Sequence, residues 1–176
     1  GGWVREDPED VKAIKAAGHD LGNHSENHKN MSQLSKEEQK EELRKVHDKV
    51  KELTGVEMEL FRPPYGDYDD QVILTAKECG YYPIQWDVDS LDWKDLPAGE
   101  ITERVVSRVQ PGSIVLFHNA ALHTPEALPA ILETLLQEGS TFVPISALIL
   151  PGEYNVEYTI DTPGRQLPAQ PSSSPR

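Results

Sequence analysis

The sequence predicts an α/β protein whose parallel sheet is either open or closed into a barrel. Two observations support this fold class. Segments with helical spacing alternate with short apolar or β-rich segments along the 176 residues. Polar clusters follow the strand-like segments, where α/β proteins gather their active sites; they are residues 24–28, 62–66, 87–93 and 116–119.

The first half of the chain is predicted to hold two helices and two strand-like segments. Capping residues and glycines indicate where each helix starts and stops. In chain order, the expected elements are a helix from Pro8 that ends at Gly18, a strand or turn at 19–23, a helix from the Ser35/Glu38 capping box to Gly55, and a strand at 59–61.

The second half repeats this alternation, and residues 113–117 are apolar as in a strand buried on both faces. Cys79 lies on the apolar side of a helix-like segment, so we expect a buried structural thiol. The expected elements are a helix at 71–78 before Gly80, a strand at 81–88, a helix at 101–109, a strand at 113–117, a helix from Thr124 with Leu128, Ile131, Leu132 and Leu135 inside, a strand at 141–145, an edge strand at 154–160 and a disordered tail at 167–176. Residues 1–150 are predicted to form the main domain, and residues 151–176 the extra strand and tail.

The composition limits the classes of function. A content of 37% hydrophobic and 27% charged residues is typical of a globular protein. The net charge of -13 disfavours binding to nucleic acid or to an anionic membrane surface. No apolar run approaches the roughly 20 residues that a membrane span requires. The single cysteine excludes an intrachain disulfide.

The first polar cluster contains two histidines, His24 and His28, spaced four positions apart. In a helix or a tight turn, this spacing places both imidazoles on one side, where a single metal ion can bind two nitrogens. Two unrelated surface histidines are the alternative, since short motifs often match by chance.

The later clusters place Arg62, Asp89 and His118 just after successive strands. A metal with a separate histidine nearby suggests a hydrolase in which the ion activates water and the imidazole protonates a leaving group. Each residue also has a structural interpretation. Arg62 and Asp89 could form a structural ion pair, His118 could be a core histidine, and Trp93 could serve only in packing.

The four clusters, in this order and spacing, resemble the second to fifth motifs of the polysaccharide deacetylases of carbohydrate esterase family four, the NodB-homology family. The resemblance extends from Gly1 to about Leu150. It implies a deformed (β/α) barrel of the NodB-homology type, a bacterial protein at the cell surface or outside the cell, and a divalent metal, most often zinc, with cobalt, nickel or manganese as alternatives. The implied reaction removes N-acetyl groups, or O-acetyl groups in some members, from a cell-wall or chitin-like polysaccharide such as peptidoglycan.

The resemblance also implies a role for individual residues. His24 and His28 would be metal ligands, and Ser25 would brace the loop between them. Arg62 would orient the catalytic base and pair with Asp89. The remaining implied roles are the backbone N–H of Tyr65 as a donor to the oxyanion, His118 as the general acid, and Trp93, Leu116 and Pro64 as residues that contact the substrate, with Trp93 and Leu116 lining the acetyl slot.

One family motif is missing from the sequence. The first motif, which supplies the catalytic base and a carboxylate ligand, does not occur, and the first strands of the family fold are expected to be absent with it. We therefore expect a companion N-terminal segment of the same protein to carry the aspartate pair. Two other functions stay open: an inactive carbohydrate-binding module on the same fold, and an oxygenase with two histidines and one carboxylate on iron.

Overall fold

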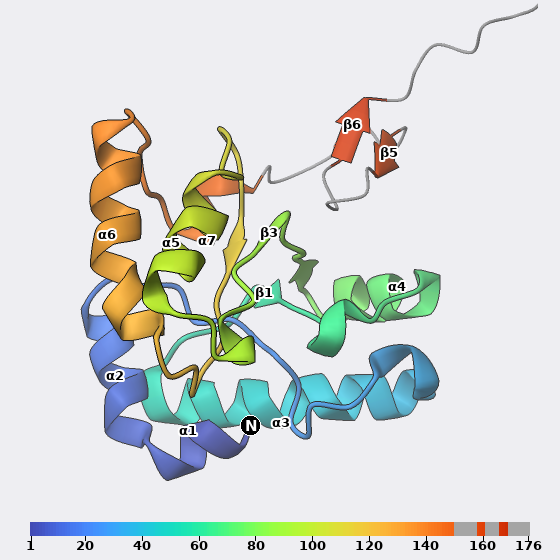
Figure 1. The fold of residues 1–176 in the computed structure, drawn as a ribbon. Coiled ribbons are helices and arrows are strands. Elements are labelled where there is room, and N and C mark those ends of the chain that lie inside the picture. Colours follow the sequence, from blue (N-terminus) through green and yellow to red (C-terminus); the bar gives the residue numbers. More distant parts are fainter. Residues whose placement is uncertain (150–157, 161–165, 169–176) are drawn as a thin grey trace, which may run out of the picture. The chain divides into compact units, whose positions relative to one another are not determined.

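Helices alternate with short strands along the chain, and two of the three strand pairs in the described residues are parallel, which confirms the predicted α/β class (Figure 1). The computed structural model describes residues 1–149, 158–160 and 166–168. The chain divides into two compact units, Gly1–Gln85 and Trp86–Arg176. No helix in the described part of the chain combines the length and the apolar character that a membrane span requires.

The first unit contains four helices and two strands. The Asp7-Pro8 start predicted one helix, and an additional short helix precedes it. The elements are α1 (Gly2–Glu6), α2 (Pro8–Ala16), α3 (Lys36–Thr54), β1 (Leu60–Phe61), α4 (Asp70–Glu78) and β2 (Tyr82–Pro83), with 3₁₀ turns at Met31–Gln33 and Pro64–Gly66. Strand β1 pairs in parallel with β2, and Asn23 forms a parallel bridge with Phe61.

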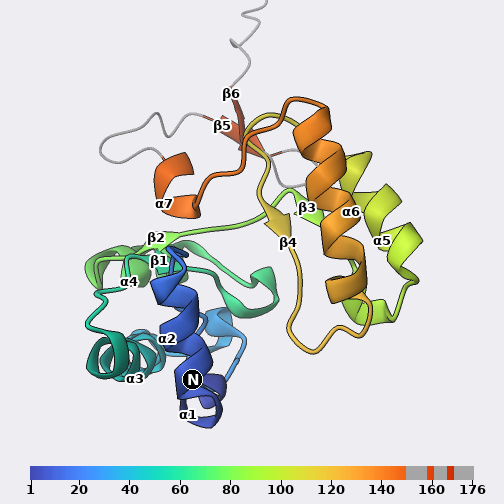
Figure 2. The ribbon, with the colours of Figure 1, turned by 90° about the vertical axis from the view of Figure 1, so that its left-hand side faces the viewer.

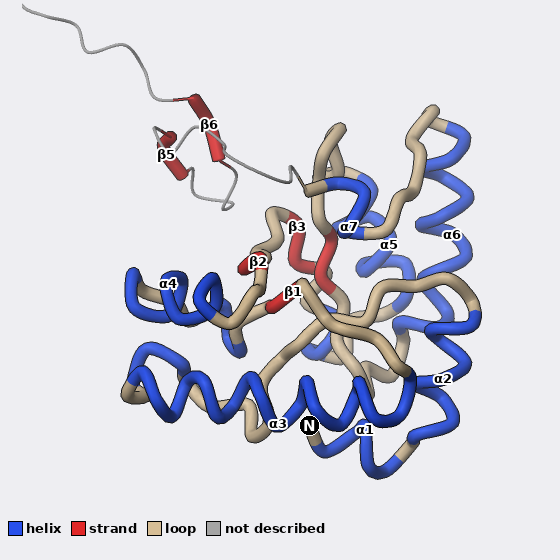
Figure 3. Tube along the Cα trace, turned by 180° about the vertical axis from the view of Figure 1, so that it is seen from behind, coloured by secondary structure: helices blue, strands red, loops and turns tan. Residues whose placement is uncertain are grey.

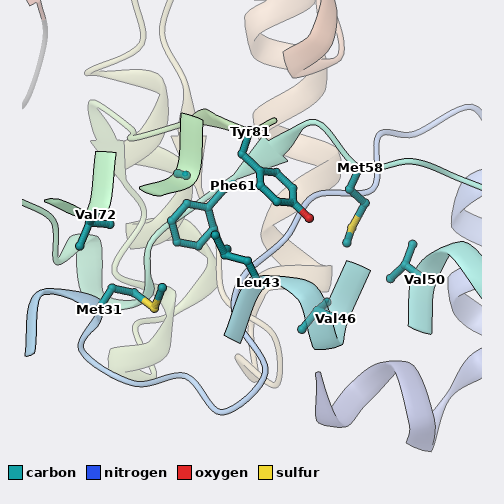
Figure 4. Packing of buried hydrophobic residues seen from close by; sticks show 9 residues of the cluster. Met31, Leu43, Val46, Val50, Met58, Phe61, Val72 and Tyr81 are labelled. Atoms are coloured by element: carbon teal, nitrogen blue, oxygen red, sulfur yellow. The ribbon is translucent and has the colours of Figure 1, made fainter. Parts of the chain in front are cut away.

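The core of the first unit is built around β1 and the inner face of α3 (Figure 4). Phe61 is fully buried and packs among side chains from α3, α4 and the segments that flank these helices. The buried members are Met31, Leu43, Val46, Val50, Met58, Phe61, Val72, Ala76 and Tyr81. Because these side chains are buried and closely packed, β1 is held rigidly. The residues that follow Phe61 therefore begin from a fixed position.

Helix α3 begins with the predicted capping box and ends at the predicted glycine. The Ser35 hydroxyl accepts the backbone N–H of Glu38, and the Glu38 carboxylate accepts the backbone N–H of Ser35. Gly55 has a φ of 72°, in the left-handed region that favours glycine. The sequence signals at both ends of this helix are therefore confirmed.

Replacing the capping serine should destabilise the protein measurably. Ser35→Ala removes the acceptor for the Glu38 N–H, and we expect a loss of about 1 kcal/mol in the free energy of unfolding. Urea denaturation monitored by circular dichroism measures this loss. Ser35→Asp retains a capping oxygen and serves as the control. Equal stability of the alanine and wild-type proteins would contradict the assigned role of the cap.

The second unit pairs strands β3 (Val88–Asp89) and β4 (Val115–Leu116) in parallel. Helices α5 (Ala98–Val106) and α6 (Thr124–Gln137) pack side by side (Figure 2). Helix α7 (Ile145–Leu148) and the antiparallel pair β5 (Tyr158–Ile160) and β6 (Gln166–Pro168) follow. The core residues are Val88, Ile101, Val105, Ala127, Ile131 and Leu135.

The strands are much shorter than predicted (Figure 3). The predicted strand at 81–88 is two strands, because the chain changes its hydrogen-bonding partner. The N–H of Ile84 bonds to the carbonyl of Phe61, whereas that of Asp87 bonds to the carbonyl of Ile114. The predicted strand at 113–117 is limited to β4.

Three further predictions were wrong. Residues 141–144 form no strand in the described part of the chain, and 145–148 are helical; Pro144 cannot donate to a sheet, and Phe142 lies half-exposed. Cys79 is exposed, because it caps the end of α4 where the chain turns. Leu132 is 40% exposed on the outer side of α6.

The predictions for the C-terminal segment fall largely outside the described residues. In the predicted edge strand at 154–160, only 158–160 are described, and they pair with 166–168. The predicted tail at 167–176 lies outside the described residues beyond Pro168.

Candidate active site

His24 and His28 lie together in a tight turn that follows the bridge between Asn23 and Phe61. Their Nε2 atoms are 3.1 Å apart. The Nδ1 atom of His24 lies 2.5 Å from the backbone carbonyl of Arg62. Because a carbonyl can only accept, Nδ1 carries the proton in the neutral ring, and Nε2 presents its lone pair toward His28.

The turn has a strained backbone, which hydrogen bonds between neighbouring residues maintain. Ser25 and His28 have φ values of 64° and 53°, which non-glycine residues seldom adopt. The Ser25 N–H donates to Asn23 Oδ1 at 3.0 Å, and the His28 N–H donates to Ser25 Oγ at 2.9 Å. The hydroxyl of Ser25 thus braces the loop, and strain of this kind is typical of functional sites.

Asn23 connects the turn to the core of the first unit. Its side chain is buried, and Nδ2 donates to the Leu43 carbonyl at 2.8 Å and to the Tyr81 hydroxyl at 2.9 Å. The Tyr81 hydroxyl also lies 2.7 Å from His47 Nδ1. Burial raises the pKa of Tyr81 to about 12, so its hydroxyl stays protonated at neutral pH. The sequence did not indicate a role for Tyr81.

The 3₁₀ turn after Arg62 carries Tyr65, whose φ of 60° is also left-handed. The Tyr65 ring is 68% exposed and stacks edge-on against His28, with ring centroids 4.6 Å apart. Pro64 is the first residue of this turn and is buried. Asp67 then accepts both the N–H and the hydroxyl of Ser32, which ties the turn to the segment after His28.

The electrostatic environment keeps the first histidine neutral. Burial, and then the charge of Arg62, lower the pKa of His24 to about 4. Burial also lowers the pKa of Arg62. A neutral imidazole with an unprotonated Nε2 is the form that binds a metal, and a bond from Nδ1 to a carbonyl is the usual way in which a metal-binding histidine is oriented.

The geometry of the pair fits a shared metal ion. Two nitrogens bound to one tetrahedral zinc are about 3.3 Å apart, close to the 3.1 Å between His24 and His28. Within the described residues, no group of three or more His, Cys, Asp or Glu side chains gathers around one point. The pair therefore fits two positions of a ligand set whose other members would be water or further groups.

In the second unit, His118 follows β4 and is bound by a buried carboxylate. Asp92 has no exposed surface, and its Oδ1 lies 2.7 Å from His118 Nδ1. Its Oδ2 accepts the backbone N–H of His118 at 3.0 Å and the hydroxyl of Thr124 at 2.5 Å. Asp92 thus holds the imidazole by both ring and backbone. The sequence contained it within an Asp-x-x-Asp-Trp motif, but we predicted no role for it.

The ionisation of Asp92 should make stability depend on pH. Burial alone would raise the pKa of Asp92, but the hydrogen bonds from Thr124 and His118 outweigh it and lower the pKa below the usual value. A lowered carboxylate pKa stabilises the folded state above about pH 4, and this contribution is lost as pH falls through the folded pKa.

We therefore expect Asp92→Asn to lower the free energy of unfolding by about 2 kcal/mol at pH 7. The difference in the free energy of unfolding between the variant and the wild type should become smaller as the pH falls below 4, because the wild-type carboxylate then becomes protonated. Urea denaturation at several pH values measures this gap. A gap that stays constant down to the lowest pH would show that ionisation of Asp92 does not contribute to stability.

The remaining predicted residues of the second unit lie near His118 or on strands β3 and β4. The Trp93 ring is exposed and meets the His118 ring edge-on at 6.5 Å between centroids. Leu116 is buried in β4, two residues before His118. Asp89 ends β3, and its Oδ1 accepts the N–H of Leu91 at 2.9 Å.

Comparisons with known proteins bear on both units. The family profile described as polysaccharide deacetylase matches residues 1–84. A peptidoglycan-N-acetylglucosamine deacetylase of Bacillus cereus is 37% identical over 155 residues, a match that covers 83% of the chain and 70% of the relative. The chain belongs to the polysaccharide deacetylase family. The resemblance inferred from the four motifs is thereby confirmed.

Other relatives are longer than this chain. A 30.6 kDa protein of Geobacillus stearothermophilus is 34% identical over 154 residues, covering 85% of the chain and 58% of that protein. The crystal structure of a CE4 family pseudoenzyme from Bacillus anthracis has a TM-score of 0.80 at 34% identity, covering 84% of the chain and 52% of that protein. The chain therefore spans about half the length of these two relatives, and its fold is of the NodB type.

The deacetylase motifs are distributed over the two units. The first unit brings His24, His28, Arg62 and Tyr65 close in space through the hydrogen bonds and ring contacts above. The second unit brings Trp93 and His118 together. Arg62 and Asp89 lie in different units, and their pairing stays a prediction.

Proposed function

We propose that this protein is a metal-dependent hydrolase that removes N-acetyl groups from an amino-sugar polymer of the bacterial cell wall. The observation that carries the proposal is the pair of converging Nε2 atoms of His24 and His28, 3.1 Å apart with His24 oriented by a carbonyl. The likeness to a peptidoglycan deacetylase supports peptidoglycan as the substrate class. O-acetyl groups and chitin-like polymers belong to the same proposal.

In this proposal, His24 and His28 hold the metal, most often zinc, with cobalt, nickel or manganese as substitutes. When bound, the ion would polarise the acetyl carbonyl and activate water. The backbone N–H of Tyr65 would donate to the oxyanion that develops. Trp93, Leu116 and Pro64 would contact the substrate around the acetyl group, where a methyl needs an apolar wall.

His118 is the proposed general acid. Its Nδ1 is bound to Asp92, which leaves Nε2 as the ring nitrogen that can give a proton to the departing amine. An amine leaves poorly without a proton, so the reaction needs this group. Arg62 would orient the catalytic base, and Asp89 would pair with Arg62. The base and a carboxylate ligand would come from an aspartate pair on an N-terminal segment of the same protein, and the protein would act at the cell surface or outside the cell.

The test is acetate release from chitooligosaccharides and from purified peptidoglycan. We expect a protein that includes the segment with the aspartate pair to release acetate with zinc or cobalt, to lose this activity with a chelator, and to recover it when metal is restored. A protein that carries the aspartate pair and still releases no acetate from either polymer with any of the four metals would overturn the proposal.

A second candidate is an inactive carbohydrate-binding module. The 34% identity to a protein named as a CE4 family pseudoenzyme favours it. Binding to insoluble peptidoglycan without acetate release would support this candidate, whereas metal-dependent release would exclude it.

A further inference from the structure

Helix α3 holds the loop between the two histidines through a buried carboxylate. Asn27 lies within that loop, one residue before His28. Its backbone N–H donates to Glu42 Oε2 at 2.7 Å, and its side-chain Nδ2 donates to Glu42 Oε1 at 2.7 Å. The Glu42 side chain is only 6% exposed. Both carboxylate oxygens thus serve one loop residue.

Other residues of α3 form hydrogen bonds or an ion pair with the same segment on both sides of Asn27. The carbonyl of Leu43 accepts Asn23 Nδ2 at 2.8 Å. Lys49 forms an ion pair with Glu26. Further along, Gln39 Nε2 donates to the carbonyl of Met31 at 2.9 Å. The loop is therefore attached to one rigid helix before, within and after the histidine pair.

Glu42 is buried in a position where a charged carboxylate is energetically unfavourable. Burying a charged group is unfavourable unless strong hydrogen bonds compensate for the lost water. Here the two hydrogen bonds from Asn27 provide this compensation. Lys29 adds a longer ion pair, with its Nζ 3.8 Å from Glu42 Oε1. Such bidentate, charge-assisted bonds restrict geometry strongly. The neighbouring left-handed backbone at His28 requires this restraint.

We propose that Glu42 is a positioning residue that presets His24 and His28 for metal binding. The inference rests on the proposed metal-dependent function. Glu42 acts through its two hydrogen bonds to Asn27. The proposed contribution is the geometry of these two bonds, which a neutral side chain of the same shape can also form.

Two substitutions of Glu42 separate geometry from charge. Glu42→Leu keeps a similar size but removes both acceptors. Glu42→Gln removes the charge but retains both bonds, because the Asn27 amide can turn to present its oxygen to the new amide. The matched control is Glu52→Leu, an exposed position on the same helix. Asn27→Ala loosens the loop from its own side and leaves α3 intact.

The measurements are the Co²⁺ dissociation constant, from the visible absorption of bound cobalt, and hydrogen exchange of the Asn27 amide without metal. We expect Glu42→Leu to weaken Co²⁺ binding by about tenfold or more, as for changes in outer partners of metal ligands, and to speed exchange at Asn27. Asn27→Ala should weaken binding in the same direction. Glu42→Gln and Glu52→Leu should bind Co²⁺ like the wild type.

The outcomes distinguish this inference from the proposed function. Faster exchange at Asn27 with unchanged Co²⁺ affinity would overturn the positioning role and leave the metal site intact. Equal losses in Glu42→Gln and Glu42→Leu would show that charge matters, which also overturns it. A wild-type protein whose Co²⁺ binding is absent, or unaffected by His28→Ala, would overturn the metal site and this inference with it. If Glu42→Leu does not fold, Asn27→Ala decides between these outcomes.

Discussion

His118→Ala should reduce the rate of deacetylation by about 10²–10⁴-fold, the usual contribution of a positioned general acid. The variant has no group to protonate the departing amine. Steady-state acetate release measures this loss, and metal analysis of the same sample should show unchanged metal content. Metal loss in His118→Ala would instead make His118 a ligand.

The hydrogen bond between His118 and Asp92 determines which substitution of His118 is the better test. Alanine at position 118 leaves the buried carboxylate of Asp92 without the ring donor that it has in the wild type, which destabilises the fold. His118→Asn retains an N–H donor toward Asp92 but cannot transfer a proton near neutral pH. We expect it to be as inactive as the alanine variant and more stable. His123→Ala, a partly exposed histidine of the same unit, is the control. Full activity of His118→Asn would overturn the assignment of His118 as the general acid.

His28→Ala should weaken metal binding by more than about 100-fold, because loss of a ligand exceeds the 10–100-fold effect of changing an outer partner. Only one imidazole, His24, would remain, and a single nitrogen holds zinc weakly. Deacetylation should fall in parallel. Zinc content after dialysis and cobalt titration measure the loss.

The control for this variant is His19→Ala. His19 is exposed and lies five residues before the pair, so its removal deletes an imidazole without changing the turn. It should leave metal content and activity unchanged. Unchanged metal occupancy in His28→Ala would show that the convergence of His24 and His28 serves another purpose.

Local signals predicted the helices well. The bonds of a helix and its caps join residues only three or four positions apart, so the Ser35/Glu38 box and Gly55 are readable directly. Strands depend on partners far along the chain. The predicted strands at 81–88 and 141–145 were therefore wrong in extent or absent in the described residues, although their β-rich composition suggested them.

In the candidate site, too, some features were predicted from the sequence and others are visible only in the structure. The spacing of His24 and His28 indicated that the imidazoles share one side, but it left open whether a helix or a turn places them. The structure has a turn, held by Ser25 and Asn23. His118 was readable from its motif, whereas its contact with Asp92 was not.

By itself, the sequence determined the boundaries of the capped helices α3 and α4 closely, the family motifs and the identity of the groups able to do chemistry. Only the tertiary structure decided which side chains orient them. Glu42 bonds to a residue 15 positions away, Asp92 to one 26 positions away, and Asn23 to one 58 positions away. Such contacts have no periodicity in the sequence, because they form only when the packing of the core brings distant segments together.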